Sequence, residues 1–263
     1  MIEKEQTDKQ TNIGSVIAVM SGKGGVGKSS VTSLLAVTLM EAGYKVGIMD
    51  ADITGPSIPK VFGINKMRVV TTEEGIFPIE TAKGIKVMSV NLLIEDETSP
   101  IVWRGPAVSN SVKQFYTDVT WGELDYLFID LPPGTGDVPL TIMQSFDIDG
   151  AIIVSSPQDL VGMIVKKSIK MANMMEVPIL GLVENMSYYQ CSECNKKINI
   201  FGKSNVPMLA DEMGLEIMAE IPIDPTFVEL CDEGKIELYN QINFTFKEYF
   251  SNRVLKTLGG LSK

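Results

Sequence analysis

The chain has 263 residues, of which 44% are hydrophobic and 21% charged, as is typical of a soluble globular protein long enough to bury its own core. Its formal net charge of -10 at pH 7 disfavours a broad electrostatic contact with nucleic acid. The sequence contains no histidine, which excludes Ser-His-Asp triads, Cys-His pairs and histidine metal ligands.

Three cysteines are too few for a disulfide scaffold and indicate a reducing compartment. The first residues are polar, and no apolar run approaches the roughly 18 residues that a bilayer span requires. We therefore expect a cytoplasmic protein.

Short apolar runs alternate with helical patterns along the chain, which predicts an α/β fold. Because the runs are apolar nearly throughout, we expect a doubly wound, mostly parallel sheet covered by helices on both faces. One domain is expected over residues 15–263, after a flexible tail over residues 1–14. The predicted strands are 16–20, 46–49, 85–90, 126–129, 151–154, 179–183 and 217–221, the predicted helices 28–42, 108–119, 160–175, 206–213 and 240–258, and a predicted hairpin 67–79.

A phosphate-binding motif lies between the first predicted strand and the first predicted helix. Residues 22–29 match G-x-x-x-x-G-K-[ST]. Glycines let backbone N–H groups turn toward phosphate oxygens, Lys28 neutralises the β and γ phosphates, and Ser29 offers a hydroxyl to Mg²⁺. We expect ATP to bind here with Mg²⁺. The candidate contacts are Gly22, Lys23, Gly24, Gly25, Val26, Gly27, Lys28, Ser29 and Ser30.

Lys23 stands inside the glycine run, where a long cation is expected to reach phosphate or a neighbouring subunit. The pattern K-G-G-x-G-K-[ST] resembles P-loop proteins of the deviant Walker A class, which use this lysine across a dimer interface. The resemblance implies that Lys23 is catalytic and acts in trans like an arginine finger. The alternative is a solvated loop lysine.

Carboxylates follow two of the predicted strands. Asp50 and Asp52 follow the run 46–49, and their spacing of two predicts that they point the same way. One can hold a Mg²⁺-bound water while the other orients the attacking water, and we assign Asp52 to catalysis and Asp50 to nucleotide and Mg²⁺ binding. Asp130 closes an apolar run, the Walker B arrangement. An aspartate at a strand end is also a common turn residue.

A cysteine pair, Cys191 and Cys194, follows the sixth predicted strand. The C-x-x-C spacing allows two thiolates to bind one metal or cluster, or to form a redox disulfide. A tetrahedral or cubane site needs four ligands, whereas the chain offers this pair, a distant Cys231 and no histidine. Two chains related by a two-fold axis supply four thiolates, which predicts a homodimer. Cys231 is expected to be a small buried side chain.

The sequence closely resembles the Mrp/ApbC-type iron-sulfur cluster carrier ATPases, relatives of the MinD and ParA proteins. The resembling stretches are 21–30, 50–63, 102–110, 121–141, 155–160, 178–194 and 200–202. The resemblance implies a homodimer that holds a 4Fe-4S cluster between two C-x-x-C pairs and passes it to apoproteins, with slow ATP hydrolysis controlling its conformation. It also implies that Asn185 helps to recognise adenine.

Two other functions remain open from the sequence. A MinD/ParA-like positioning ATPase would act on membrane or DNA, and a C-terminal apolar face supports it. That face comprises Phe246, Phe250, Val254, Leu258 and Leu261. We expect this helix to dock on its own domain instead, and expect no nucleic acid or membrane partner. The second alternative is a zinc-bridged, non-catalytic dimer, because zinc accepts the same four thiolates.

Overall fold

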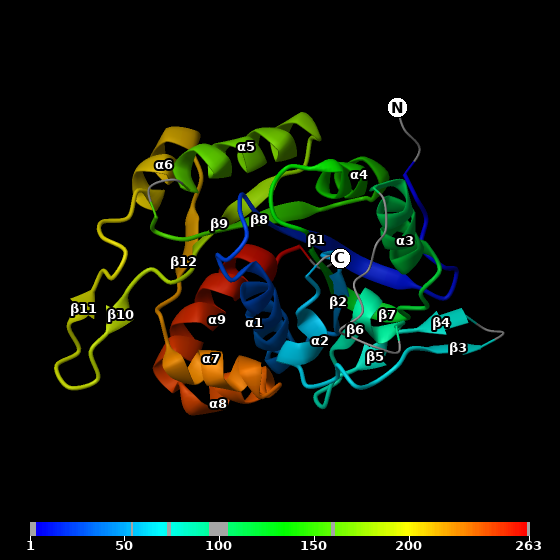
Figure 1. Cartoon of the computed structure of the whole chain (residues 1–263), viewed down its shortest axis with the longest axis horizontal. Coiled ribbons are helices and arrows are strands. Elements are labelled where there is room, and N and C mark those ends of the chain that lie inside the picture. The colour runs from blue at the N-terminus through cyan, green and yellow to red at the C-terminus, as the bar shows by residue number, and fades with distance from the viewer. Residues whose placement is uncertain (1–3, 54, 73–74, 95–104, 159–160, 262–263) are drawn as a thin grey trace.

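An eight-stranded sheet forms the centre of the protein (Figure 1). The computed structural model describes residues 4–53, 55–72, 75–94, 105–158 and 161–261. The strand order is β12-β9-β8-β1-β7-β2-β6-β5, and every neighbouring pair is parallel except β5 and β6. The strands are β1 (Asn12–Ser21), β2 (Val46–Asp50), β5 (Ile79–Glu80), β6 (Lys86–Ser89), β7 (Glu123–Asp130), β8 (Gly150–Ser155), β9 (Ile179–Glu184) and β12 (Ile217–Glu220). The predicted mostly parallel sheet is confirmed.

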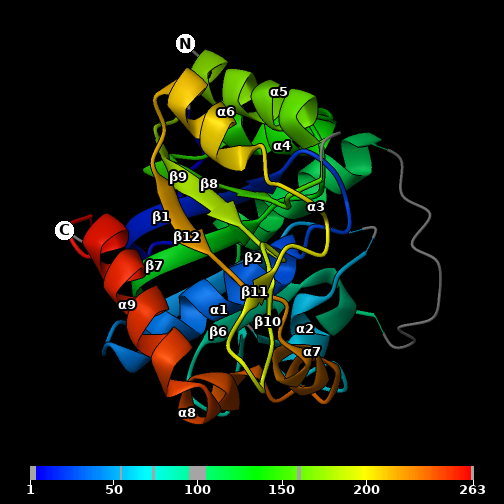
Figure 2. The ribbon, with the colours of Figure 1, turned by 90° about the vertical axis from the view of Figure 1, so that its left-hand side faces the viewer.

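Helices cover both faces of this sheet, as Figures 1 and 2 show. One face carries α3 (Gly105–Thr117), α4 (Asp137–Ser145), α5 (Val161–Met174) and α6 (Val206–Met213). The other carries α1 (Lys28–Glu41), α2 (Ile58–Val61), α7 (Pro225–Asp232), α8 (Tyr239–Ile242) and α9 (Phe244–Leu258). Short 3-10 turns span Val90–Leu92 and Ile236–Leu238. The doubly wound arrangement expected from the apolar strands is therefore present.

The central strand β1 contributes to the two larger hydrophobic cores. Ile17 and Val19 belong to the core beneath α1 and α9. Ala18 and Met20 belong to the core beneath α3 and α4. Because side chains alternate between the two faces of a strand, burial of both faces requires an unbroken apolar run.

The C-terminal helix α9 docks on the domain. Its residues Phe246, Phe250, Val254 and Leu258 are buried in the core that α1 also lines. The Tyr126 hydroxyl in β7 donates a hydrogen bond of 2.7 Å to the Leu258 carbonyl oxygen. The expected self-docking of this face is confirmed. In the described part of the chain, no helix combines the length and apolar character that crossing a membrane requires.

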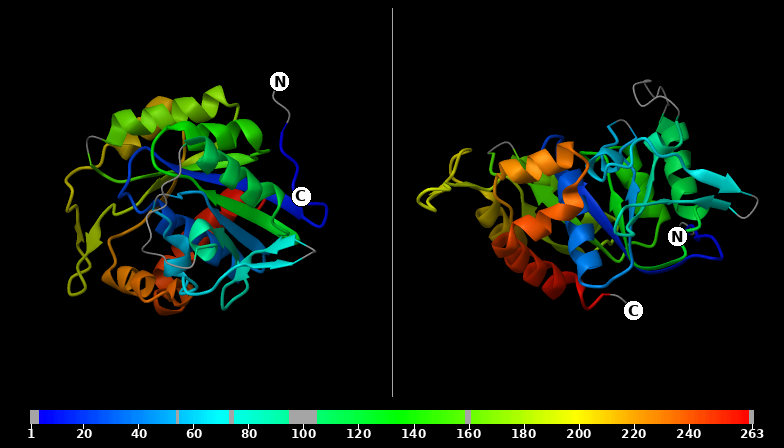
Figure 3. Two further views of the ribbon diagram at one scale, coloured as in Figure 1. Left: turned by 45° about the vertical axis from the view of Figure 1, so that its right-hand side comes forward. Right: turned by 90° about the horizontal axis from the view of Figure 1, so that it is seen from below.

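Two small hairpins project at opposite ends of the molecule (Figure 3). One consists of β3 (Val70–Thr72) and β4 (Gly75–Phe77), which confirms the predicted hairpin excursion apart from residues 73–74, which lie outside the described residues. The other consists of β10 (Tyr189–Gln190) and β11 (Lys197–Ile198) and carries the cysteine pair.

The structure differs from the sequence-based boundaries in a few places. The predicted helix 240–258 is broken at Asn243, whose side chain accepts a hydrogen bond from the Phe246 N–H and begins α9. Ordered packing begins before residue 15, because β1 starts at Asn12 and the Lys4 ammonium donates to the Phe146 carbonyl oxygen at 2.7 Å. Parts of the resembling and helical stretches lie outside the described residues, namely 54, 102–104 and 159–160.

Candidate functional site

The predicted phosphate loop and carboxylates meet at the carboxyl edge of the sheet. Asp50 and Asp130 are the last residues of β2 and β7 and lie opposite each other in the strand register. The loop of residues 22–27 follows β1, which neighbours β7. Open α/β sheets bind their ligands at the carboxyl ends of the parallel strands. A pocket of about 210 Å³ lies there, lined by Ser21, Lys23, Gly24, Gly25, Val26, Gly27, Lys28, Ser29, Ser30, Asp52, Ser57 and Pro133.

The backbone of this loop has the shape of an anion cradle. Gly25 and Gly27 have φ values of 82° and 76°, a region that favours glycine. A Cβ on Gly27 would lie only 2.3 Å from the Asn185 amide nitrogen. Helix α1 begins directly afterwards with no side-chain cap, so its first N–H groups remain available to an anion.

Lys28 and Asp130 form the buried centre of the site. The Lys28 Nζ lies 2.7 Å from Asp130 Oδ2, with the two side chains 6% and 0% exposed. An ammonium has three N–H donors, so Lys28 can still bind phosphate oxygens beside its contact with Asp130. Asp130 also accepts hydrogen bonds of 2.6 Å from the hydroxyls of Ser29 and Thr32. Sequence reasoning missed Thr32, although its position four residues after Lys28 places both on one face of α1.

Asp50 and Asp52 occupy different environments. Asp50 is 1% exposed and accepts a hydrogen bond of 3.2 Å from the Ser89 hydroxyl at the end of β6. Burial, together with the charge of Asp130, raises the pKa of Asp50 to about 8. Asp52 lies beyond the end of β2, is half-buried and lines the pocket. Of the two aspartates, only Asp52 lines the pocket. Sequence reasoning missed Ser89, because this residue belongs to no motif.

The raised pKa of Asp50 predicts a pH-dependent stability in the absence of nucleotide and Mg²⁺. Its ordinary value is 3.8, so between pH 3.8 and about 8 the folded state retains a proton that the unfolded state loses. The free energy of unfolding therefore falls across this window as pH rises. Asp50→Asn removes the effect, and its stability relative to the wild type is expected to increase from pH 5 to pH 8 in urea unfolding. Asp52→Asn should show the same trend more weakly, because the charge of Asp52 contributes only part of the rise in the pKa of Asp50. A difference between Asp50→Asn and wild type that stays constant with pH would contradict the prediction.

Two further side chains border the loop. The Lys23 ammonium donates a hydrogen bond of 2.6 Å to Gln158 Oε1, in the segment that follows β8. The Asn185 amide, directly after β9, is 6% exposed and donates to the Val26 carbonyl oxygen at 2.9 Å. Lys23 therefore lies within the phosphate loop and Asn185 contacts its backbone. The sequence predicted neither the Gln158 contact nor the contact of Asn185 with Val26.

The cysteine pair lies on the β10–β11 hairpin, which projects away from the sheet (Figure 1). Cys191 is half-buried and Cys194 is exposed, and both are free thiols. Hydrogen bonds from the backbone N–H groups of Cys194 and Glu193, followed by the Cys194 side chain, lower the pKa of the Cys191 thiol. A lower pKa favours the thiolate that binds metals. No group of three or more metal-binding side chains occurs among the residues that the structure describes.

Cys231 lies apart from this pair, on α7. It is half-buried and packs against the core that α1 lines. Burial raises the pKa of its thiol to about 11, despite a hydrogen bond with Ser30 that acts in the opposite direction. Such a thiol is a poor metal ligand at neutral pH.

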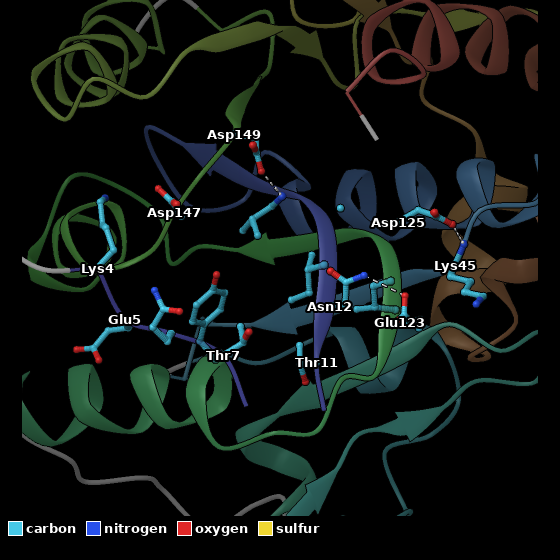
Figure 4. A pocket seen from close by; sticks show the side chains of 16 residues that line it. Lys4, Glu5, Thr7, Thr11, Asn12, Lys45, Glu123, Asp125, Asp147 and Asp149 are labelled. Carbon is cyan, nitrogen blue, oxygen red and sulfur yellow. Dashed lines mark hydrogen bonds between the residues drawn. The ribbon is translucent and has the colours of Figure 1, made fainter. Parts of the chain in front are cut away.

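A larger cavity of about 520 Å³ lies at the opposite, amino edge of the sheet (Figure 4). Its acidic side chains mostly serve the fold: Asp149 accepts from the Val16 N–H at 2.8 Å, and Asp125 accepts from the Lys45 N–H at 2.7 Å. Its carboxylates are those of Glu5, Glu123, Asp125, Asp147 and Asp149. With five carboxylates against the ammonium groups of Lys4 and Lys45, this lining disfavours phosphate at the amino edge.

Comparison with known proteins identifies the family. The family model of the NUBPL iron-transfer P-loop NTPases matches residues 12–257. An iron-sulfur cluster carrier protein of Clostridium perfringens is 51% identical over 235 residues, 87% of this chain and 82% of the relative.

Solved structures agree with this result. A nucleotide-binding protein from Archaeoglobus fulgidus, solved in complex with ADP, is 48% identical with a TM-score of 0.77, covering 86% of this chain and 89% of that one. The MinC–MinD complex of Aquifex aeolicus is 19% identical with a TM-score of 0.68, over 93% and 96% of the chains, and shares the fold. With its phosphate loop, strand-end carboxylates and cysteine hairpin, the chain belongs to the NUBPL iron-transfer family of P-loop NTPases.

Proposed function

We propose that this protein is an ATP-hydrolysing iron-sulfur cluster carrier, which binds a 4Fe-4S cluster between the C-x-x-C pairs of a homodimer and transfers it to apoproteins. The observation that carries the proposal is the half-site on the β10–β11 hairpin. Cys191 and Cys194 are free, neighbouring thiols, and the described residues supply no third ligand beside them. Because a cubane cluster takes four thiolates, a second copy of the hairpin completes the set. The name of the Clostridium perfringens relative supports this cargo.

The carboxyl-edge pocket is proposed to bind ATP and Mg²⁺. The glycine cradle and the buried Lys28 ammonium, which keeps N–H donors free beside its contact with Asp130, suit phosphate oxygens. Ser29 and Asp130 are the proposed holders of Mg²⁺ and its waters, with Asp50 behind them. The Archaeoglobus fulgidus relative was solved with ADP, which supports an adenine nucleotide. We propose that Asn185 binds the adenine. To do so, its side-chain amide would give up its hydrogen bond to the Val26 carbonyl oxygen.

Hydrolysis is proposed to depend on both copies. Asp52 lines the pocket and orients the water that attacks the γ phosphorus, and ADP leaves with inorganic phosphate formed. Lys23 of the second copy stabilises the charge that develops on the phosphates, after release of its contact with Gln158. Pairing of two chains therefore completes both the ATPase centre and the cluster site.

The two alternatives have less support. A MinD-like membrane anchor needs an available apolar C-terminal face, whereas α9 buries its apolar residues in the domain core. The likeness to MinD at 19% identity concerns the fold alone. A zinc-bridged dimer would use the same thiolates, so it is the competing outcome of the experiment below.

Anaerobic reconstitution with iron and sulfide tests the proposal. The expected product is a brown dimer with about two iron and two sulfide per chain, one cubane per pair of chains. It should donate its cluster to an apoferredoxin, as measured by the ferredoxin's spectrum. Metal analysis of the protein purified without air provides the comparison with zinc. Stoichiometric zinc without iron or sulfide, or a loaded protein that is monomeric by light scattering, would overturn the proposal.

A further inference from the structure

Glu184 is a buried carboxylate that directly precedes Asn185 and lies outside the roles assigned above. It is the last residue of β9 and 1% exposed. Its carboxylate accepts a hydrogen bond of 2.7 Å from the Ser187 hydroxyl and another from the Ser204 hydroxyl. A charge in a buried position needs such donors to remain stable. The carboxylate and the two hydroxyls therefore act as one connected unit.

This unit closes the base of the cysteine excursion. Ser187 precedes residues 188–203 and Ser204 follows them, and this excursion contains the whole β10–β11 hairpin. Figure 2 shows it leaving the sheet after β9 and returning before α6. The Ser187 N–H also donates to the Ile221 carbonyl oxygen at 2.9 Å, and the Ser204 hydroxyl accepts from the Val206 N–H at 3.0 Å. Glu184 thus fixes both ends of the segment that carries the thiols.

The peptide neighbour of Glu184 contacts the phosphate loop. The Asn185 amide donates to the Val26 carbonyl oxygen at 2.9 Å, and its N–H donates to the Ser155 carbonyl oxygen at 2.8 Å. The Asn185 side-chain amide also packs directly against Gly27, because a Cβ on Gly27 would lie 2.3 Å from the amide nitrogen. A change in the loop at Val26 and Gly27 would therefore reach Asn185 directly.

We propose that Glu184 is a positioning residue that couples occupancy of the nucleotide pocket to the geometry of Cys191 and Cys194. Nucleotide moves Asn185, the adjoining Glu184 carboxylate shifts against the hydroxyls of Ser187 and Ser204, and the base of the cysteine hairpin follows. The inference rests on the proposed function for its purpose, which is to let nucleotide control how tightly the thiolates hold a cluster. The coupling itself can be measured without a cluster.

Thiol alkylation in cluster-free protein provides this measurement. A Cys231→Ala background leaves Cys191 and Cys194 as the reacting thiols, with iodoacetamide as the probe under anaerobic conditions. Adding MgADP, or Mg²⁺ with a non-hydrolysable ATP analogue, is expected to change the alkylation rate by about fivefold. Glu184→Gln preserves shape but loses one acceptor oxygen and the charge, and should reduce the change to less than about 1.5-fold while nucleotide affinity stays within about twofold. Ser192→Ala, on the exposed part of the hairpin, is the matched control and should respond like the background protein.

The outcomes separate coupling from a merely structural role. A Glu184→Gln protein that keeps the full response, or a background protein with no response to nucleotide, overturns the proposal. Where Glu184→Gln does not fold, judged by circular dichroism, Ser187→Ala and Ser204→Ala replace it: loss of the response in either supports the link, and its retention in both overturns it. A wild type that loads a cluster without any thiol response rejects the coupling alone. A thiol response without cluster loading rejects the carrier function alone.

Discussion

Cys191→Ala is expected to abolish retention of the iron-sulfur cluster while leaving ATP affinity within about twofold of the wild type. Each chain contributes two thiolates to the proposed site, so the substitution leaves the dimer with two ligands where a cubane takes four. Cys191 also carries the thiol whose pKa is lowered by its neighbouring backbone N–H groups, so it supplies the more readily formed thiolate. The hairpin lies outside the buried cores, and stability should change by about 0.5 kcal/mol or less.

Iron and sulfide analysis with the visible absorption spectrum checks this prediction, and isothermal titration calorimetry checks nucleotide binding. Cys231→Ala is the control with the same chemistry, because the Cys231 thiol packs on the domain core and should not contribute a ligand. Full iron and sulfide content in Cys191→Ala would contradict the assignment. Loss of the cluster in Cys231→Ala would assign a ligand role to α7 instead.

Lys28→Ala is expected to weaken ATP binding by about 100-fold or more, because truncating one partner of a buried charge contact costs about 2 to 5 kcal/mol. The Lys28 side chain is 6% exposed and lines the pocket with the phosphate cradle. In the variant, water would not replace its attraction for phosphate at equal strength. The variant also leaves the Asp130 carboxylate without its cation, which should lower the melting temperature of the nucleotide-free protein. The cysteine hairpin is separate from this centre, and its thiols should still accept iron and sulfide.

Calorimetry of ATP binding in the presence of Mg²⁺ measures the effect, with thermal unfolding recorded in parallel. Lys45→Ala is a matched control, since Lys45 is an exposed lysine at the opposite edge of the sheet. ATP affinity within tenfold of the wild type in a folded Lys28→Ala protein would argue against the assigned pocket.

The sheet and its flanking helices could be predicted because both faces of the strands are covered. Burial on both faces gives continuous apolar runs such as that of β1, which stand out from the surrounding polar sequence. Helices α2, α4 and α7 are only 4, 9 and 8 residues long, too short to show a clear helical period. None of the three is among the predicted helices, whereas α6, also of 8 residues, was predicted with its observed bounds.

The candidate site likewise has a part that could be predicted from the sequence and a part that could not. The phosphate loop, Asp130 and the cysteine pair have fixed spacings that carry their chemistry. Ser89 and Ser204 have no such spacing, because each meets its carboxylate through the pairing of distant strands or the closure of a long excursion. The equal orientation expected for Asp50 and Asp52 assumed that the strand continues, whereas β2 ends at Asp50. Whether Lys23 acts across a dimer and Asn185 binds adenine stay predictions.

The position of β1 between β7 and β8 bears on how the protein emerges from the ribosome. Strand β1 is synthesised before both of its neighbours, since Ile17 pairs with Phe128 on one side and with Gly150 on the other. Lys28 is likewise synthesised before Asp130, the carboxylate that it contacts in the folded protein. A half-translated chain therefore exposes an unpaired, apolar central strand and cannot yet bind ATP. Such late closure favours slow folding and nascent chains prone to aggregation, so chaperone protection during translation would shield this strand until its partners arrive.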